Sequence, residues 1–213
     1  MLSRRTLLLS GLAFAALVPN LTQAAPDASG DPFAYMVDLS NRVLDEIRNN
    51  PDLHKADPEQ VRKLVDELLM PAADFAMMTR MTVGPRWRQA DAGQREELMA
   101  GFKNLLVRVY SGALTTVTDH RCELRPTRNK TVRDEMIVRT LLKSTGQNDI
   151  GLDYRIYRNK AGEWKIVDVN VEGIWMVENY RSQFAPILSQ DGVPGLITAL
   201  KTKSEQFVKK EGQ

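Results

Sequence analysis

Residues 164–184, WKIVDVNVEGIWMVENYRSQF, decide the fold of this chain. From Trp164 to Val171, isoleucine and valine alternate with charged or polar residues, which is typical of a half-buried strand. Gly173 then interrupts the alternation. After it, apolar side chains recur at helical spacing: Met176, Val177, Tyr180 and Phe184. The stretch therefore predicts a strand that leads directly into an amphipathic helix.

The half of the chain that precedes this stretch has helical periodicity. Asp31-Pro32 and Asp57-Pro58 each combine an N-cap residue with a proline at the first helical position. Asp91 is a third predicted N-cap, and Pro71 and Gly84-Pro85 are expected to end helices. The predicted helices begin at residues 32 and 58, with a short helix at 72–81 and the longest at 92–117.

From Arg121 onward the apolar period changes from helical spacing to two. Strands are predicted at 121–125, 132–143, 150–158 and 164–171, with a hairpin turn at 159–162. Two helices follow, at 176–188 and 193–207. The predicted helices come first in the chain, and an antiparallel meander follows them. This order predicts an α+β domain with the helices packed on one sheet face.

The N-terminus has the composition of a cleaved export signal. Residues 1–5 are basic, residues 6–18 are mostly Leu and Ala, and Thr22-Gln23-Ala24 fits a cleavage site. The apolar run is too short for a membrane-spanning helix, the alternative reading. We therefore predict a signal peptide at 1–24 and a single domain at 25–213. Arg4-Arg5 also resembles a twin-arginine signal, so the Sec and twin-arginine routes both stay open.

The charge balance argues against nucleic-acid binding. Arg4 and Arg5 are the only charges in the predicted signal, and without them the remaining Lys and Arg equal the 27 acidic residues. Such a chain lacks the net positive charge of a nucleic-acid binder. A local basic cluster is either a solvated surface or a docking site for an acidic partner or anionic headgroups. Its members are Arg121, Arg125, Arg128, Lys130 and Arg133.

Few residues could carry catalysis or bind a metal. The single cysteine, Cys122, excludes an intramolecular disulfide and is expected to be a buried structural thiol. His54 and His120 are the only histidines, and both are expected at the surface or at a cap. A zinc site and a Ser/His/Asp set are therefore not predicted.

The decisive stretch resembles the signature of the toluene-tolerance/MlaC family of periplasmic phospholipid-binding proteins. The residues that carry the resemblance are Trp164, Lys165, Ile166, Asp168, Val169, Glu172, Gly173, Asn179, Tyr180, Arg181 and Phe184. A second resemblance is a turn with Val83, Gly84, Trp87 and Arg88. The resemblance implies an NTF2-like fold, in which helices packed on a curved antiparallel sheet enclose an apolar cavity.

The apolar strand and helix faces are the expected lining of that cavity. From pattern alone a filled core is favoured over a cavity, and only the resemblance reverses this in favour of a lipid pocket. The expected ligand-binding residues are Met81, Leu106, Tyr110, Met136, Val138, Leu142, Leu152, Tyr154, Ile156, Val167, Val169, Val171, Ile174, Met176 and Tyr180. The segment 79–87 is the hypothetical lid.

The resemblance implies a periplasmic shuttle that carries phospholipid between the inner and outer membranes and maintains outer-membrane lipid asymmetry. The implied partners are an inner-membrane ABC transporter complex and an outer-membrane lipoprotein–porin complex. We expect a monomer with phospholipid as cargo, no other cofactor, no metal and no catalytic residue.

Two other functions stay open. An NTF2-like enzyme acting on a small apolar substrate requires an acid or base inside the cavity, for which Asp168 and Tyr154 are the candidates. However, strand parity places Val167, Val169 and Val171 inward, with Asp168 and Glu172 in water. A structural or chaperone-like subunit with a filled core is the third reading.

Overall fold

A computed structural model of the protein describes residues 26–126 and 132–211. The predicted signal peptide and its cleavage site, together with Arg128 and Lys130, lie outside the described residues. The helices are α1 (Pro32–Asn49), α2 (Pro58–Leu64), α3 (Phe75–Val83), α4 (Ala92–Leu114), α5 (Met176–Gln190) and α6 (Gly192–Glu211). The strands are β1 (Arg121–Leu124), β2 (Glu135–Lys143), β3 (Ile150–Arg158), β4 (Trp164–Val171) and β5 (Ile174–Trp175).

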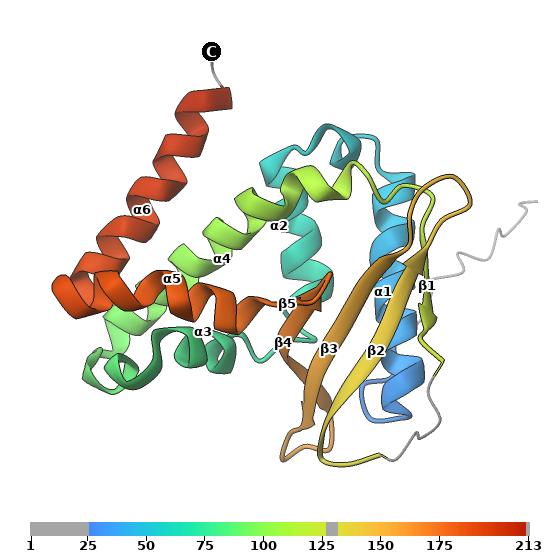
Figure 1. Ribbon diagram of the computed structural model, residues 1–213, viewed down its shortest axis with the longest axis horizontal. Coiled ribbons are helices and arrows are strands. Elements are labelled where there is room, and N and C mark those ends of the chain that lie inside the picture. The colour runs from blue at the N-terminus through green and yellow to red at the C-terminus, as the bar shows by residue number, and fades with distance from the viewer. Residues whose placement is uncertain (1–25, 127–131, 212–213) are drawn as a thin grey trace, which may run out of the picture.

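The five strands form one antiparallel sheet in the order β1-β2-β3-β4-β5 (Figure 1). Each strand pairs with its sequence neighbour, as expected for a meander. The register between β3 and β4 shifts at one point, where Arg155 pairs with Asp168 but Ile156 pairs with Ile166. Val167 is therefore an extra residue, a β-bulge, and bulges bend the strand that carries them.

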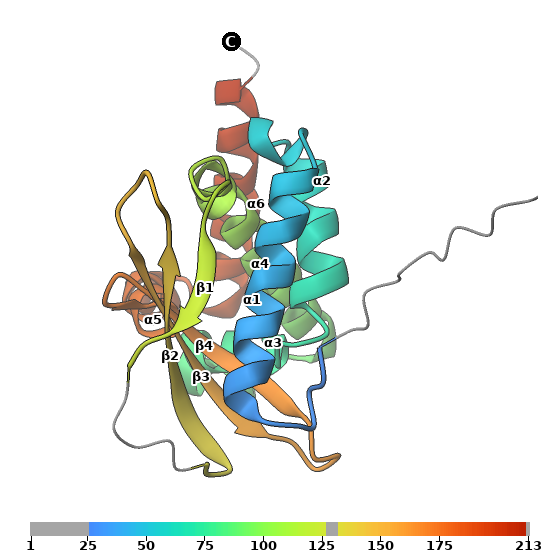
Figure 2. The same cartoon turned by 90° about the vertical axis from the view of Figure 1, so that its right-hand side faces the viewer.

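Helix α1 lies along one face of the sheet (Figure 2). Its N-terminal half buries Phe33 and Met36 against Val138, Ile156 and the other apolar side chains of that face. The helix begins as the sequence predicts, because the Asp31 carboxylate accepts hydrogen bonds from the backbone N–H of Phe33 and Ala34. This packing fills one end of the sheet face with side chains.

A second layer consists of α3, α4, α5 and α6, which extend beyond the end of the sheet (Figure 1). Their shared core contains the aromatic side chains of Phe75, Phe102, Tyr180 and Phe184. Asp91 caps α4 through a capping box with Gln94, in which each side chain bonds the other residue's backbone N–H. Within the described residues, no helix has the length and apolar character needed to cross a membrane.

The predicted α+β architecture is confirmed, with helices on a curved antiparallel sheet around an apolar cavity, and the main local difference lies at residues 172–175. The sequence predicted that Gly173 separates β4 from a helix. The structure instead has a tight hairpin, in which Glu172 and Gly173 both have positive φ values of 51° and 89°. A type I′ turn requires positive φ at both of its central residues. The turn reverses the chain into the short strand β5, and α5 begins directly after that strand.

Candidate functional site

An apolar cavity of about 380 Å³ lies between the sheet and helices α1, α2 and α4. Its volume falls in the range of small-molecule sites. Its wall is made almost entirely of aliphatic and aromatic side chains. Those contributed by α1 and α2 are Leu39, Val43, Leu44, Ile47, Val61 and Leu64. The geometry thus provides a partly open, apolar space between the sheet and these helices.

Lys103 is the one charged side chain among the described residues that line this cavity. Its ammonium group lies 2.8 Å from the carboxylate of Asp66, in the π-helical segment Val65–Leu69 that follows α2. Lys103 also lines an adjacent groove of about 580 Å³, which shares Met70, Ala73 and Phe75 with the cavity wall. The cavity and the groove therefore adjoin at Lys103, whose ammonium group is paired with Asp66.

Tyr154 contributes one of the hydroxyl groups on this apolar wall. Its hydroxyl lies 2.8 Å from the Ser40 hydroxyl, which in turn donates to the Met36 carbonyl at 2.5 Å. Burial raises the pKa of Tyr154 above its ordinary range, so the phenol keeps its proton. A protonated, hydrogen-bonded phenol is a poor general base, which argues against an enzymatic role for Tyr154.

Eight of the residues expected from the sequence lie on the cavity wall. The sheet provides alternating side chains from β2, β3 and β4, and the helices provide the remainder. These eight are Leu106, Tyr110, Leu142, Leu152, Tyr154, Val169, Val171 and Met176.

The other seven expected residues do not line the cavity. Met136, Val138 and Ile156 pack with α1 in the filled end of the sheet, and Tyr180 belongs to the aromatic core. Val167 is the bulge residue, and Ile174 is 60% exposed in the hairpin. Met81 lines a separate cleft, as do several residues of the hypothetical lid segment 79–87.

The sequence interpretation missed the contribution of α1 and α2 to the cavity. Val43, Leu44, Val61 and Leu64 follow the helical period of these two segments, which predicts an apolar helix face but not a cavity wall. The helical spacing of apolar residues is the same in a helix face that packs on a core and in one that borders an empty volume. No local signal in the sequence separates the two cases.

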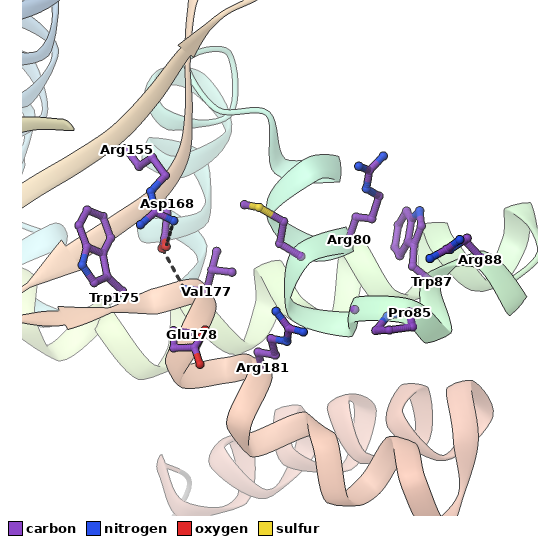
Figure 3. Close-up of a pocket in the computed structure, with 12 residues that line it drawn as sticks. Arg80, Pro85, Trp87, Arg88, Arg155, Asp168, Trp175, Val177, Glu178 and Arg181 are labelled. Atoms are coloured by element: carbon purple, nitrogen blue, oxygen red, sulfur yellow. Dashed lines mark hydrogen bonds and ion pairs between the residues drawn. The ribbon is translucent and has the colours of Figure 1, made fainter. Parts of the chain in front are cut away.

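Asp168 is buried, so the expectation that its carboxylate lies in water is wrong. It is 1% exposed, and one carboxylate oxygen accepts from the backbone N–H of Val169 and of Val177, both at 2.9 Å. Its other oxygen lies 3.6 Å from the Arg155 guanidinium (Figure 3). Trp175, the residue before α5, provides no side-chain cap. The Asp168 carboxylate therefore caps α5 from the neighbouring strand.

Burial raises the pKa of Asp168 above its ordinary value of 3.8, although the two backbone hydrogen bonds and Arg155 act in the opposite direction. A raised pKa means that the folded protein binds this proton more tightly than the unfolded chain. The contribution of Asp168 to stability is therefore greatest at low pH and falls as pH rises from about the ordinary value through the folded pKa.

We expect Asp168→Asn to remove this part of the pH dependence while keeping an oxygen that can accept from Val177. Urea unfolding of both proteins across acidic pH measures the difference, which should grow in favour of the variant as pH rises. Asp168→Ala, which leaves the first turn of α5 uncapped, should cost about 1–3 kcal/mol. A stability difference between wild type and Asp168→Asn that stays constant with pH contradicts this account.

The histidines and the cysteine show no arrangement for catalysis or metal binding. His120 is 0% exposed, which corrects the expectation of a surface or capping position, and its Nδ1 lies 3.3 Å from the Asp119 carboxylate. His54 bonds the Ile47 carbonyl near the end of α1. Cys122 is buried and free, as expected. Among the residues that the structure describes, no three His, Cys, Asp or Glu side chains could share a metal ion.

The sequence of this chain is similar to those of known proteins. The model of the family described as MlaC protein matches residues 37–202. The intermembrane phospholipid transport system binding protein MlaC of Haemophilus influenzae is 24% identical over 181 residues, covering 84% of this chain and 85% of the relative. Toluene tolerance protein ttg2D of Pseudomonas putida is 26% identical over 185 residues, covering 85% of this chain and 82% of the relative.

A solved structure is similar in three dimensions. The phospholipid-binding protein from Ralstonia solanacearum, in complex with a phospholipid, superposes with a TM-score of 0.78 at 33% identity. The similarity covers 84% of this chain and 99% of that protein. Since the family match spans most of the chain and the solved relative has the same fold, this chain belongs to the MlaC protein family.

Proposed function

We propose that this protein is a phospholipid carrier that holds acyl chain in the cavity between the sheet and helices α1, α2 and α4. The observation that carries the proposal is the composition of the cavity wall, which is apolar apart from Lys103 and the hydroxyls of Ser40, Tyr110, Tyr154 and Thr116. Two sixteen-carbon chains represent on the order of 25 kcal/mol of transfer free energy from water. A carrier must hide such surface, and the apolar wall of this cavity can shield part of it.

The phospholipid headgroup is placed, in this proposal, where the cavity adjoins the groove. Lys103 lies at this junction, and Lys165 lines the groove close by. Ammonium groups attract a phosphate electrostatically without requiring a fixed geometry. The groove is also lined by the carboxylates of Asp74 and Glu96. An apolar interior that opens beside two lysines still suits an amphipathic ligand better than a small apolar substrate.

The positions of the candidate acid and base groups support an enzymatic function less well than a carrier function. Of the two candidate acid/base groups, Asp168 lies outside the apolar cavity and caps α5, and Tyr154 retains its proton. The proposal therefore contains no catalytic residue. The relatives whose names record a function bind or transport phospholipid.

We further propose that the carrier works in the periplasm, after removal of residues 1–24, and moves phospholipid between the inner and outer membranes to maintain outer-membrane lipid asymmetry. In this proposal the protein is a monomer, which receives and delivers its cargo at an inner-membrane ABC transporter complex and an outer-membrane lipoprotein–porin complex. The family membership and the name of the Haemophilus influenzae relative, an intermembrane transport system component, support this assignment.

Native mass spectrometry tests the carrier function on protein purified from a bacterial periplasm without detergent. We expect a mature chain that starts at Ala25 and carries a roughly stoichiometric phospholipid. Extraction and analysis of the lipid then identify the headgroup. A protein that is free of lipid, and that takes up none from liposomes, contradicts the proposal.

A further inference from the structure

A second concave site lies on the other side of the wall that bounds the apolar cavity. This arginine cleft has a volume of about 690 Å³ and lies between α3, the 3₁₀ helix Gly84–Gln89, the sheet and α5 (Figure 3). Its lining shares no residue with the apolar cavity. The arginine cleft is therefore a separate site, and the cargo proposed above gives it no role.

The arginine cleft has an excess of positive charge. Arg80, Arg88, Arg155 and Arg181 line it, against the carboxylates of Asp168 and Glu178. The lining of the cleft is therefore more positively charged than the chain as a whole, whose net charge is close to zero. Several cations that line one concavity attract an anionic ligand.

Only one of the four arginines has a partner that holds it. Arg155 lies 3.6 Å from the Asp168 carboxylate, and its guanidinium lies 4.7 Å from the ring centre of Trp175. Arg80, Arg88 and Arg181 are exposed and form no hydrogen bond or ion pair with any residue that the structure describes. Three guanidinium groups at the rim of the arginine cleft thus remain available to a ligand.

The other side chains of the arginine cleft indicate what kind of ligand it takes. Trp87, Trp175 and Met81 accompany the arginines, and the lining contains no lysine. Trp, Met and Arg are enriched in protein–protein interfaces, whereas Lys is depleted there. The combination of arginine with tryptophan and methionine therefore favours a protein segment over a lipid headgroup as the ligand.

We propose that the arginine cleft is a docking site for an acidic segment of a partner protein. Carboxylates of that segment pair with Arg80, Arg88 and Arg181, and its apolar side chains contact the two tryptophans. The inference extends the proposed function and rests on it for its biological role, since a carrier has to dock wherever it collects or delivers its cargo. The binding itself does not depend on lipid.

Binding of a fluorescein-labelled octaglutamate peptide, followed by anisotropy at low ionic strength, tests the inference. The triple variant Arg80→Glu/Arg88→Glu/Arg181→Glu should bind the peptide about tenfold more weakly or worse. The matched control Arg62→Glu/Lys63→Glu/Lys160→Glu changes the net charge by the same amount at exposed positions outside the cleft. It should stay within about twofold of wild type.

Three outcomes overturn the proposal. They are a wild-type protein that does not bind the peptide, a control triple that loses as much affinity as the cleft variant, and a cleft variant that keeps its peptide affinity but loses binding of phosphatidylglycerol vesicles. The substituted side chains are exposed, so the fold should persist; if circular dichroism shows otherwise, Arg181→Glu alone repeats the test. Phospholipid loading is measured in parallel, so a failure of the carrier function is seen separately from a failure of docking.

Discussion

Filling the apolar cavity from both walls is expected to abolish phospholipid loading while the protein stays folded. The variant is Leu106→Trp/Val169→Trp, because Leu106 projects from α4 and Val169 from β4, and both border the empty volume. Keeping only three methylene groups of an acyl chain out of the cavity costs about 2.4 kcal/mol, or roughly fiftyfold in affinity. Native mass spectrometry of the periplasmic protein should show the lipid-free mass.

The matched control for this variant is Ile174→Trp. Ile174 is an expected site residue by sequence, but it is exposed in the hairpin and does not border the cavity. A tryptophan there should leave the lipid-bound fraction unchanged. If Leu106→Trp/Val169→Trp carries as much lipid as wild type, or if Ile174→Trp loses it, the acyl chain does not occupy this cavity.

The parts of the fold that depend on local chemistry could be predicted from the sequence. Asp31, Asp57 and Asp91 each accept hydrogen bonds from the first turn of a helix, as expected from their position before proline or before a long apolar pattern. The change of period near Arg121 likewise marks the start of the sheet. Such signals involve residues within a few positions of one another.

Strand β4 shows where the alternation rule fails. The bulge at Val167 lets Ile166 share the cavity face with Val169 and Val171, although simple parity assigns Ile166 to the opposite face. Asp168 does lie on the face predicted for it. That face is not open to water at this point, because α5 begins against it. The burial of Asp168 therefore follows from a tertiary contact that strand periodicity does not encode.

The division between core and cavity is also set by tertiary packing. Val138 and Ile156 lie at the end of the sheet face that α1 fills with Phe33 and Met36, so they form a packed core. Leu142, Leu152 and Val171 lie where the cavity separates the sheet from α4. Because both groups show the same alternation in the sequence, only the placement of the helices distinguishes a core residue from a cavity residue.

The second large effect that we expect is a loss of stability when the aromatic core is disrupted. Phe102 is 0% exposed, and its ring centre lies 5.6 Å from Phe75, 5.1 Å from Tyr180 and 5.7 Å from Phe184. Phe102→Ala removes three aromatic contacts and leaves a void among α3, α4 and α5. We expect a loss of about 3–5 kcal/mol, measured by urea unfolding, which is a large share of the stability of an ordinary domain.

Two milder substitutions separate loss of packing from loss of function. Phe102→Leu keeps much of the apolar volume and should cost less than half as much as Phe102→Ala. Tyr180→Phe keeps the ring, and since Tyr180 belongs to this core rather than to the cavity wall, its phospholipid loading should equal that of wild type. If Phe102→Ala costs less than about 1 kcal/mol, the four rings do not form a tightly packed core. A loss of lipid binding in Tyr180→Phe at unchanged stability extends the binding site into the aromatic core, because the hydroxyl then acts on the ligand and not on the fold.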